Sequence, residues 1–221
     1  MIGSCESLTK DHMHRFSWIT APDNQTPAAY EQPVLRSHHF VALPTIGALV
    51  EGWLLVVPRR DLGNLSLLAT AEKRDLAEQT AELSLRLQVY GMPVYQFEHG
   101  SLPGQDGACG VDHAHLHLVP LPFDLYDLAV CERDVRWEEL PKTASPWEHA
   151  LPGREYLAIR APDGRSAIGY AKQPTSQWFR RLIASALGRP DEWNYRTHSA
   201  LELIDATAKR VGASREQQQR L

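Results

Sequence analysis

The chain has 221 residues and a formal net charge of −4, and this length favours one domain with extensions over two full domains. Hydrophobic residues make up 43% and charged residues 23% of it, which excludes disordered and fibrous classes. The slightly acidic charge gives no reason to expect general nucleic-acid binding or an anionic membrane surface. No stretch reaches the roughly 18 apolar residues of a membrane span. The N-terminus lacks an apolar secretory core, so we expect a cytoplasmic protein.

The first third of the chain predicts an irregular arm followed by strands. Residues 1–32 are polar and rich in turn-forming residues, which is typical of an N-terminal arm without regular structure. Residues 34–43 have strand character, and the apolar run at 53–57 is closed by Pro58. Because that run is continuously apolar, we expect a strand that is covered on both faces.

The segment from Thr70 to Tyr90 is the clearest helix. Apolar residues recur in it at helical spacing, and Gly91 marks its end. We expect Thr70 to cap the helix, with Lys73 at the third position, where a capping box requires Glu or Gln. The capping box is therefore predicted to be incomplete.

Strand residues return after this helix. Residues 94–98 predict one strand, residues 99–110 a glycine-rich loop, and residues 111–122 a second strand by strict alternation. An order of strands, one long helix and further strands predicts an α+β domain with an antiparallel sheet over residues 33–125.

Residues 126–221 predict an extension that packs on the same domain. Within it, residues 155–171 indicate a hairpin with a turn at 162–164. Residues 176–187 predict an amphipathic helix. Residues 199–211 predict another helix, followed by a frayed polar tail.

Three of the ten histidines point to chemistry. His113, His115 and His117 alternate within one predicted strand. Successive side chains of a strand point to opposite faces, so these imidazoles share one face, about 6.5 to 7 Å apart. Ala114 and Leu116 then belong to the apolar face that packs into the core.

Aligned histidines can form a metal site, since imidazole is a ligand for zinc, iron and copper. The letters VDHAH resemble the opening motif of barrel-type metal hydrolases, but too few residues follow His117 for such a barrel of about 250 residues. Three cysteines without a CxxC pair predict neither a four-cysteine zinc site nor a disulfide framework. A metal-dependent hydrolase remains an alternative.

Aligned histidines can also perform nucleophilic catalysis at phosphorus. A neutral imidazole, with an ordinary pKa of about 6.5, is a good nucleophile at neutral pH. Flanking histidines can donate hydrogen bonds to phosphate oxygens, and backbone N–H groups of a glycine-rich loop supply further donors. A glycine-rich loop at 99–110 directly precedes the histidines.

The segment VDHAHLHLVP resembles the signature of the histidine triad (HIT) superfamily, which covers nucleotide hydrolases and nucleotidyl transferases. PTIGALVEGWLLVVPRRDLGNLSLL is similar to the family strand that ends in Val-Pro before a basic pair, and FEHG with GACG resembles the segment leading to the triad. The resemblance covers residues 33–125. It implies a HIT-like antiparallel sheet with one long helix, here followed by a C-terminal hairpin and a helical extension.

This resemblance also implies roles for individual residues. His115 would attack the α-phosphorus and form a covalent nucleotidyl-histidine, while His113 and His117 orient it and bind phosphate oxygens. A nucleotide or dinucleoside polyphosphate is the implied substrate, with no cofactor, and the family often forms dimers, which allows a homodimer here. Backbone donors to the phosphate would come from Gly107, Ala108, Cys109 and Gly110.

The sequence departs from the family pattern around the triad, which leaves base and sugar preference open. Some members hold structural zinc through an N-terminal CxxC, but Cys5 has no partner at Leu8, so no such zinc is predicted. Trp53 stands where many members have a fourth histidine, and Thr45 where many have a ribose-binding aspartate. Gly110 replaces a hydroxyl-bearing residue of some members, and Asp61 replaces a further histidine.

Two more candidates end the strand beside the triad. Glu98 is predicted either to orient a triad histidine or hold a ribose, or to be a solvated strand end. His99 is predicted to donate to a leaving group or to have no catalytic role. Apart from catalysis, a HIT-fold nucleotide-binding or regulatory protein with little turnover remains an alternative.

Overall fold

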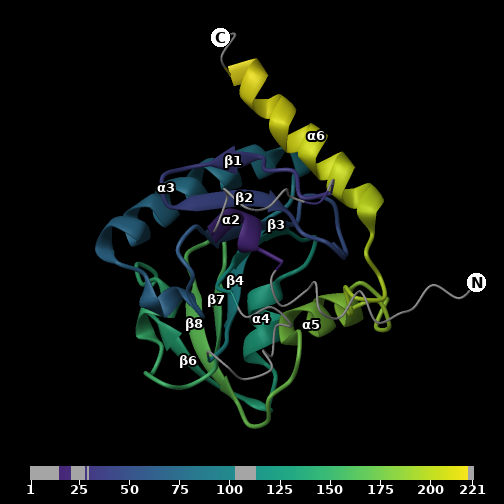
Figure 1. The fold of residues 1–221 in the computed structure, drawn as a ribbon. Coiled ribbons are helices and arrows are strands. Elements are labelled where there is room, and N and C mark those ends of the chain that lie inside the picture. The colour runs from purple at the N-terminus through teal and green to yellow at the C-terminus, as the bar shows by residue number, and fades with distance from the viewer. Residues whose placement is uncertain (1–14, 21–27, 29, 103–112, 219–221) are drawn as a thin grey trace, which may run out of the picture.

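A computed structural model describes residues 15–20, 28, 30–102 and 113–218, and its central element is one antiparallel sheet (Figure 1). The eight strands found in these residues have the order β1-β2-β3-β5-β4-β7-β8-β6. The strands are β1 (Leu35–Arg36), β2 (Phe40–Pro44), β3 (Leu54–Pro58), β4 (Val94–Gly100), β5 (Leu116–Pro120), β6 (Val135–Leu140), β7 (Tyr156–Arg160) and β8 (Ser166–Ala171). The helices are α2 (Ser17–Thr20), α3 (Thr70–Leu87), α4 (Leu125–Val130), α5 (Trp178–Ala186) and α6 (Leu201–Gln218), with 3-10 turns at Leu65–Leu67, Gln88–Tyr90 and Pro146–His149. The predicted α+β class with an antiparallel sheet is confirmed.

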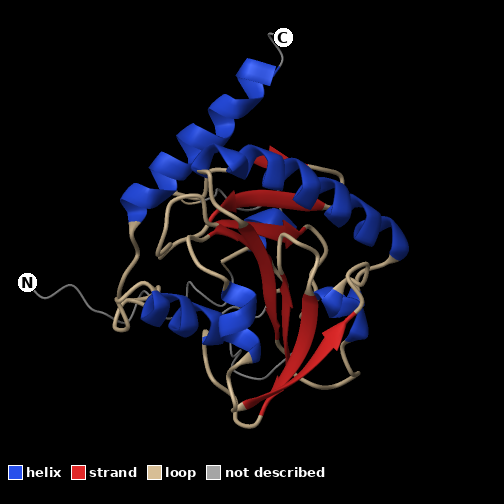
Figure 2. Ribbon diagram, turned by 180° about the vertical axis from the view of Figure 1, so that it is seen from behind, coloured by secondary structure: helices blue, strands red, loops and turns tan. Residues whose placement is uncertain are grey.

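Helices cover both faces of this sheet. α3 lies across the face that Figure 2 shows, and α2, α4 and α5 lie on the opposite face in Figure 1. β2 and β3 are buried along their whole length between these layers. Phe40 and Leu54 belong to the core under α3, whereas Val41 and Leu55 pack with the residues of α2. The strand predicted at 53–57 is therefore covered on both faces, as expected.

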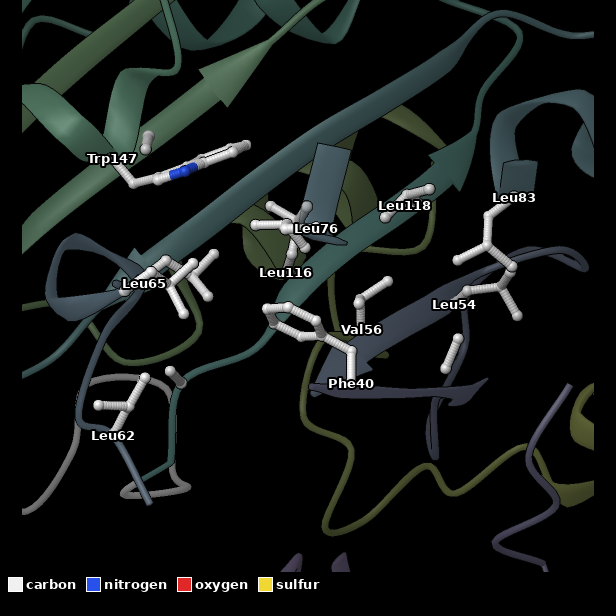
Figure 3. Packing of buried hydrophobic residues seen from close by; sticks show 14 of the residues in the cluster. Phe40, Leu54, Val56, Leu62, Leu65, Leu76, Leu83, Leu116, Leu118 and Trp147 are labelled. Atoms are coloured by element: carbon white, nitrogen blue, oxygen red, sulfur yellow. The ribbon is translucent and has the colours of Figure 1, made fainter. Parts of the chain in front are cut away.

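The core under α3 determines how the triad strand is oriented. Figure 3 shows Leu76 and Leu83 of α3 among the leucines of the sheet, including Leu116 and Leu118 of β5. Burying a leucine side chain contributes about 1.5 to 3 kcal/mol. Because side chains alternate along a strand, this burial turns His117 to the opposite face. The predicted apolar face of the triad strand is confirmed.

α3 starts at Thr70, but its N-cap residue is Ala69. Glu72 occupies the third helical position and accepts a hydrogen bond from the Ala69 backbone N–H at 2.7 Å. The expected cap at Thr70, with Lys73 in the third position, is therefore wrong by one residue. A carboxylate at this place satisfies one of the unpaired N–H groups of the first turn, whichever residue precedes the helix.

The C-terminal part of the chain continues the same sheet. β7 pairs with β4, and the predicted hairpin is present as β7 and β8. α4 and β6 were not predicted from the sequence. β6 is an edge strand in which only Val135 is fully buried, so its charged sequence lacks the apolar alternation that identifies a half-buried strand.

Two helices follow the hairpin. α5 lies within the predicted range 176–187. α6 starts close to the predicted position but continues to Gln218, beyond the predicted end at residue 211. The added residues 212–218 end in Arg, Glu and two Gln, which favour a helix even where it projects from the sheet, as α6 does in Figure 1. No helix in the described residues is long and apolar enough to cross a membrane.

Candidate functional site

The three histidines lie at the start of β5, which begins later than predicted. Only His117 is within the strand, and His113 and His115 precede it. Before the strand begins, the Ala114 N–H donates to the carbonyl of Leu62, which lies beyond the end of β3, at 2.6 Å. The predicted strand start at residue 111 is therefore too early, and residues 111 and 112 lie outside the described residues.

The imidazoles are nevertheless close together. The ring centroids of His115 and His117 are 4.9 Å apart in an edge-to-face arrangement. All three histidine side chains are buried. They share the face of the sheet opposite to α3, since Ala114 and Leu116 pack into the core under that helix.

The hydrogen bonds of His115 determine which ring nitrogen carries its proton. Its Nδ1 lies 2.8 Å from the backbone carbonyl oxygen of His113. A carbonyl oxygen only accepts, so Nδ1 is the donor and the lone pair of the neutral ring is on Nε2. Burial lowers the pKa of His115 to about 4, an effect to which the positive charge of Arg15 adds. His115 is therefore neutral at pH 7.

His117 is held by aromatic neighbours. The Trp53 indole donates from Nε1 to Nδ1 of His117 at 2.9 Å, and the Phe97 ring stacks on the imidazole with centroids 4.6 Å apart. Burial holds the pKa of His117 well below its ordinary value, and the neighbouring positive groups act in the same direction. This imidazole is therefore also neutral at pH 7.

His113 is anchored at both ring nitrogens. Its Nε2 lies 2.9 Å from the Pro58 carbonyl oxygen, which can only accept a hydrogen bond. Its Nδ1 lies 3.3 Å from a carboxylate oxygen of Asp61, the residue that stands where the family often has a histidine. These two contacts tie the first triad histidine to the end of β3.

The segment around α2 covers the histidines. The Phe16 ring lies 5.8 Å from the His113 ring and 5.9 Å from the His115 ring, centroid to centroid. Arg15 forms a buried ion pair with Glu31 at 3.1 Å, which fixes the start of this segment. The remaining cavity beside the imidazoles has a volume of only about 20 Å³, which is the space of about one water molecule.

The C-terminal part of the chain contributes to this cavity, which sequence reasoning missed. Arg180 of α5 and Tyr195 line it together with His115 and His117. The Arg180 guanidinium lies 5.0 Å from the centroid of the Trp53 ring and donates to the carbonyl oxygens of Trp193 and Gly47. No local pattern links α5 to the triad, because their residues meet only through the fold.

Two other predicted residues do not line this cavity. Glu98 accepts hydrogen bonds from the Leu65 N–H at 2.7 Å and the Tyr156 hydroxyl at 2.5 Å, and burial raises its pKa to about 8. It belongs to the face of the sheet opposite to His117, so the structure does not bring it to the triad. His99 lies two residues after Phe97 on β4 and therefore shares the sheet face of His117, but it pairs with Glu155 at 2.7 Å and lines a separate cavity of about 60 Å³.

The predicted phosphate loop cannot be placed. Gly107, Ala108, Cys109 and Gly110 lie outside the described residues. Among the residues that are described, no group of three or more His, Cys, Asp or Glu side chains is arranged to hold a metal ion.

Comparisons with known proteins found similarities to solved structures. No family model and no curated protein sequence matches the chain. A hypothetical histidine triad nucleotide-binding protein from Sulfolobus tokodaii aligns with 49% of this chain and 70% of its own, at 16% identity and a TM-score of 0.39. A Hit-like protein involved in cell-cycle regulation from Bartonella henselae aligns with 48% of this chain and 77% of its own, at 16% identity and a TM-score of 0.36. A hypothetical protein from Leishmania major aligns with 49% of this chain and 73% of its own, at 22% identity and a TM-score of 0.39.

Proposed function

We propose that the protein cleaves a nucleoside phosphoanhydride or phosphoramidate, or transfers its nucleotidyl group, with His115 as the nucleophile. The observation that carries this proposal is the hydrogen bond from His115 Nδ1 to the His113 carbonyl. It assigns the proton of the neutral imidazole to Nδ1 and the lone pair to Nε2, the atom that would attack, and the low pKa keeps that lone pair unprotonated at neutral pH.

The reaction would run in two displacements. In the first, the Nε2 lone pair of His115 forms a bond to the α-phosphorus, and the bond to the leaving group breaks with its electron pair. The ring then carries a positive charge, which the His113 carbonyl stabilises through Nδ1–H. In the second, the oxygen of water or another acceptor forms a bond to the phosphorus, the phosphorus–nitrogen bond breaks with its electron pair returning to Nε2, and the proton of the acceptor is lost to solvent.

The small cavity favours a second candidate function. A volume of about 20 Å³ is far below the roughly 300 Å³ of a small-molecule site, so a nucleotide enters only when Phe16 and its segment move away from the histidines. A protein in which this segment stays over the histidines would bind nucleotides only outside this cavity, with little or no turnover.

A covalent adduct separates these two functions. The protein is mixed with each member of a panel of adenylyl and guanylyl compounds. One sample is measured by intact mass under native conditions and a second after denaturation. We expect a mass increase equal to one nucleoside monophosphate that survives denaturation and maps to His115. Nucleotide that binds but leaves no covalent mass in any member of the panel would favour the binding protein instead.

The pH dependence of adduct formation follows from the pKa of His115. The neutral imidazole is the reactive form, and its lowered pKa of about 4 means that it stays neutral well below the ordinary value. We therefore expect the single-turnover rate to change by less than about twofold between about pH 7.5 and 5.5, where an ordinary imidazole would lose about tenfold. Circular dichroism at each pH serves as the control for folding. A tenfold fall over this range would contradict the assignment of the buried His115 as nucleophile.

A further inference from the structure

The residue that precedes β3 contacts the triad directly. Trp53 is completely buried, and its Nε1–H donates to Nδ1 of His117 at 2.9 Å. Phe97 packs edge-to-face on the indole with centroids 5.9 Å apart, and the Arg180 guanidinium lies 5.0 Å from its centroid. The indole is therefore held from several sides in the orientation that reaches His117.

The chemistry of the indole constrains the imidazole. An indole N–H is a donor only, so Nδ1 of His117 must present its lone pair to Trp53. In the neutral imidazole the proton is then on Nε2. An imidazolium would carry a proton on Nδ1 as well, which would place two buried donors head to head and lose the hydrogen bond. Trp53 thus selects one tautomer of His117 and disfavours its charged form.

We propose that Trp53 is a positioning residue that keeps His117 neutral with its proton on Nε2, so that His117 donates a hydrogen bond to the substrate without releasing a proton. This inference rests on the proposed function for its catalytic meaning, but the tautomer itself is a property of the unliganded protein. It gives a role to a position where the sequence departs from the family pattern.

A His117 that only donates hydrogen bonds discriminates between leaving groups of the substrate. A phosphate leaving group departs as a stable anion and needs hydrogen bonds to its oxygens. An amine leaving group must gain a proton before or during its departure. His117 does not supply this proton, because it is neutral and its Nδ1 is held by an indole that does not titrate. The site therefore favours phosphoanhydrides over phosphoramidates of the same nucleoside.

Nuclear magnetic resonance tests the tautomer without any substrate. Histidine is labelled with nitrogen-15, long-range proton–nitrogen spectra are recorded at pH 7.5, and the His117 signals are identified by their loss in His117→Gln. We expect a neutral ring with the proton on Nε2. A proton on Nδ1, or an imidazolium, would overturn the inference whether or not the protein turns over nucleotides.

A pair of tryptophan variants tests the effect on the reaction. Trp53→Phe keeps an aromatic ring but removes the donor, and we expect a mixture of His117 tautomers and a fall in kcat of about tenfold or more, with KM changed far less. The control is Trp137→Phe, because Nε1 of Trp137 is buried without a hydrogen-bond partner in the described residues. It should leave the tautomer and kcat unchanged. An unchanged His117 tautomer in folded Trp53→Phe would overturn the role of Trp53.

The leaving-group comparison tests the donor-only role. For the wild-type protein, kcat/KM is measured for an adenosine phosphoanhydride and for adenosine phosphoramidate. We expect the anhydride to be cleaved at least about tenfold more efficiently. Equal or faster cleavage of the phosphoramidate would overturn the donor-only role of His117 even if the Nε2–H tautomer is found.

Discussion

Replacing His115 with alanine is expected to lower turnover by about three orders of magnitude or more and to abolish the covalent adduct. The reason is that the imidazole forms a bond to phosphorus in the proposed reaction, and no other group at that position can take over this bond. Turnover is measured with the compound of the panel that gives the strongest adduct, and adduct formation is followed by intact mass.

The control for this substitution is another histidine outside the site. His149 is exposed and belongs to the 3-10 turn at Pro146–His149, so His149→Ala should retain full turnover. Thermal unfolding of both variants checks that the loss does not reflect misfolding, since His115 is buried. A folded His115→Ala protein that keeps more than about a tenth of the activity would refute the assignment of His115 as nucleophile.

Replacing Gly47 with alanine is expected to lower the free energy of unfolding by about 3 kcal/mol. Gly47 has φ of 68°, and an added Cβ would lie 2.5 Å from the Cβ of Tyr195 and 2.8 Å from the carbonyl oxygen of His198. The Gly47 N–H also donates to the Ser199 carbonyl at 2.6 Å. The glycine is therefore the point where the C-terminal segment approaches the backbone closely, and thermal or denaturant unfolding measures the effect.

Gly91 provides a matched comparison. It has φ of 64°, almost the same as Gly47, but no atom lies within 4 Å of an added Cβ. Gly91→Ala should therefore cost only the strain of the left-handed conformation, about 1 kcal/mol. If the two substitutions lower the free energy of unfolding equally, close packing against Tyr195 is not the reason that position 47 requires glycine.

Local patterns in the sequence predicted the elements that carry the site. The helical spacing from Thr70 onward identified α3, and the alternation through His113, His115 and His117 identified which face of the triad strand enters the core. These predictions succeed because a helix or strand imposes its own period on the residues of one short segment. Where a segment lacked such a period, as in α4 and β6, the sequence analysis missed the element.

The surroundings of the triad depend on contacts between distant segments. Trp53 and Arg180 reach the histidines from segments far apart in the sequence, and Phe16 covers them from a third segment. The position of Glu98 in the chain predicts a place near the triad, but its carboxylate packs on the other face of the sheet.

The sequence by itself determined the identity of the nucleophile candidate, the face of the strand that it occupies and the α+β class. Only the tertiary structure decided which ring nitrogen of His115 and of His117 carries the proton, how little space lies beside them, and which C-terminal residues line that space. Side-chain type and strand alternation are local properties, whereas a tautomer depends on the hydrogen-bond partner that the fold brings to each nitrogen. That partner is Trp53 for His117, and for His115 it is the carbonyl of His113 where the backbone leaves the sheet.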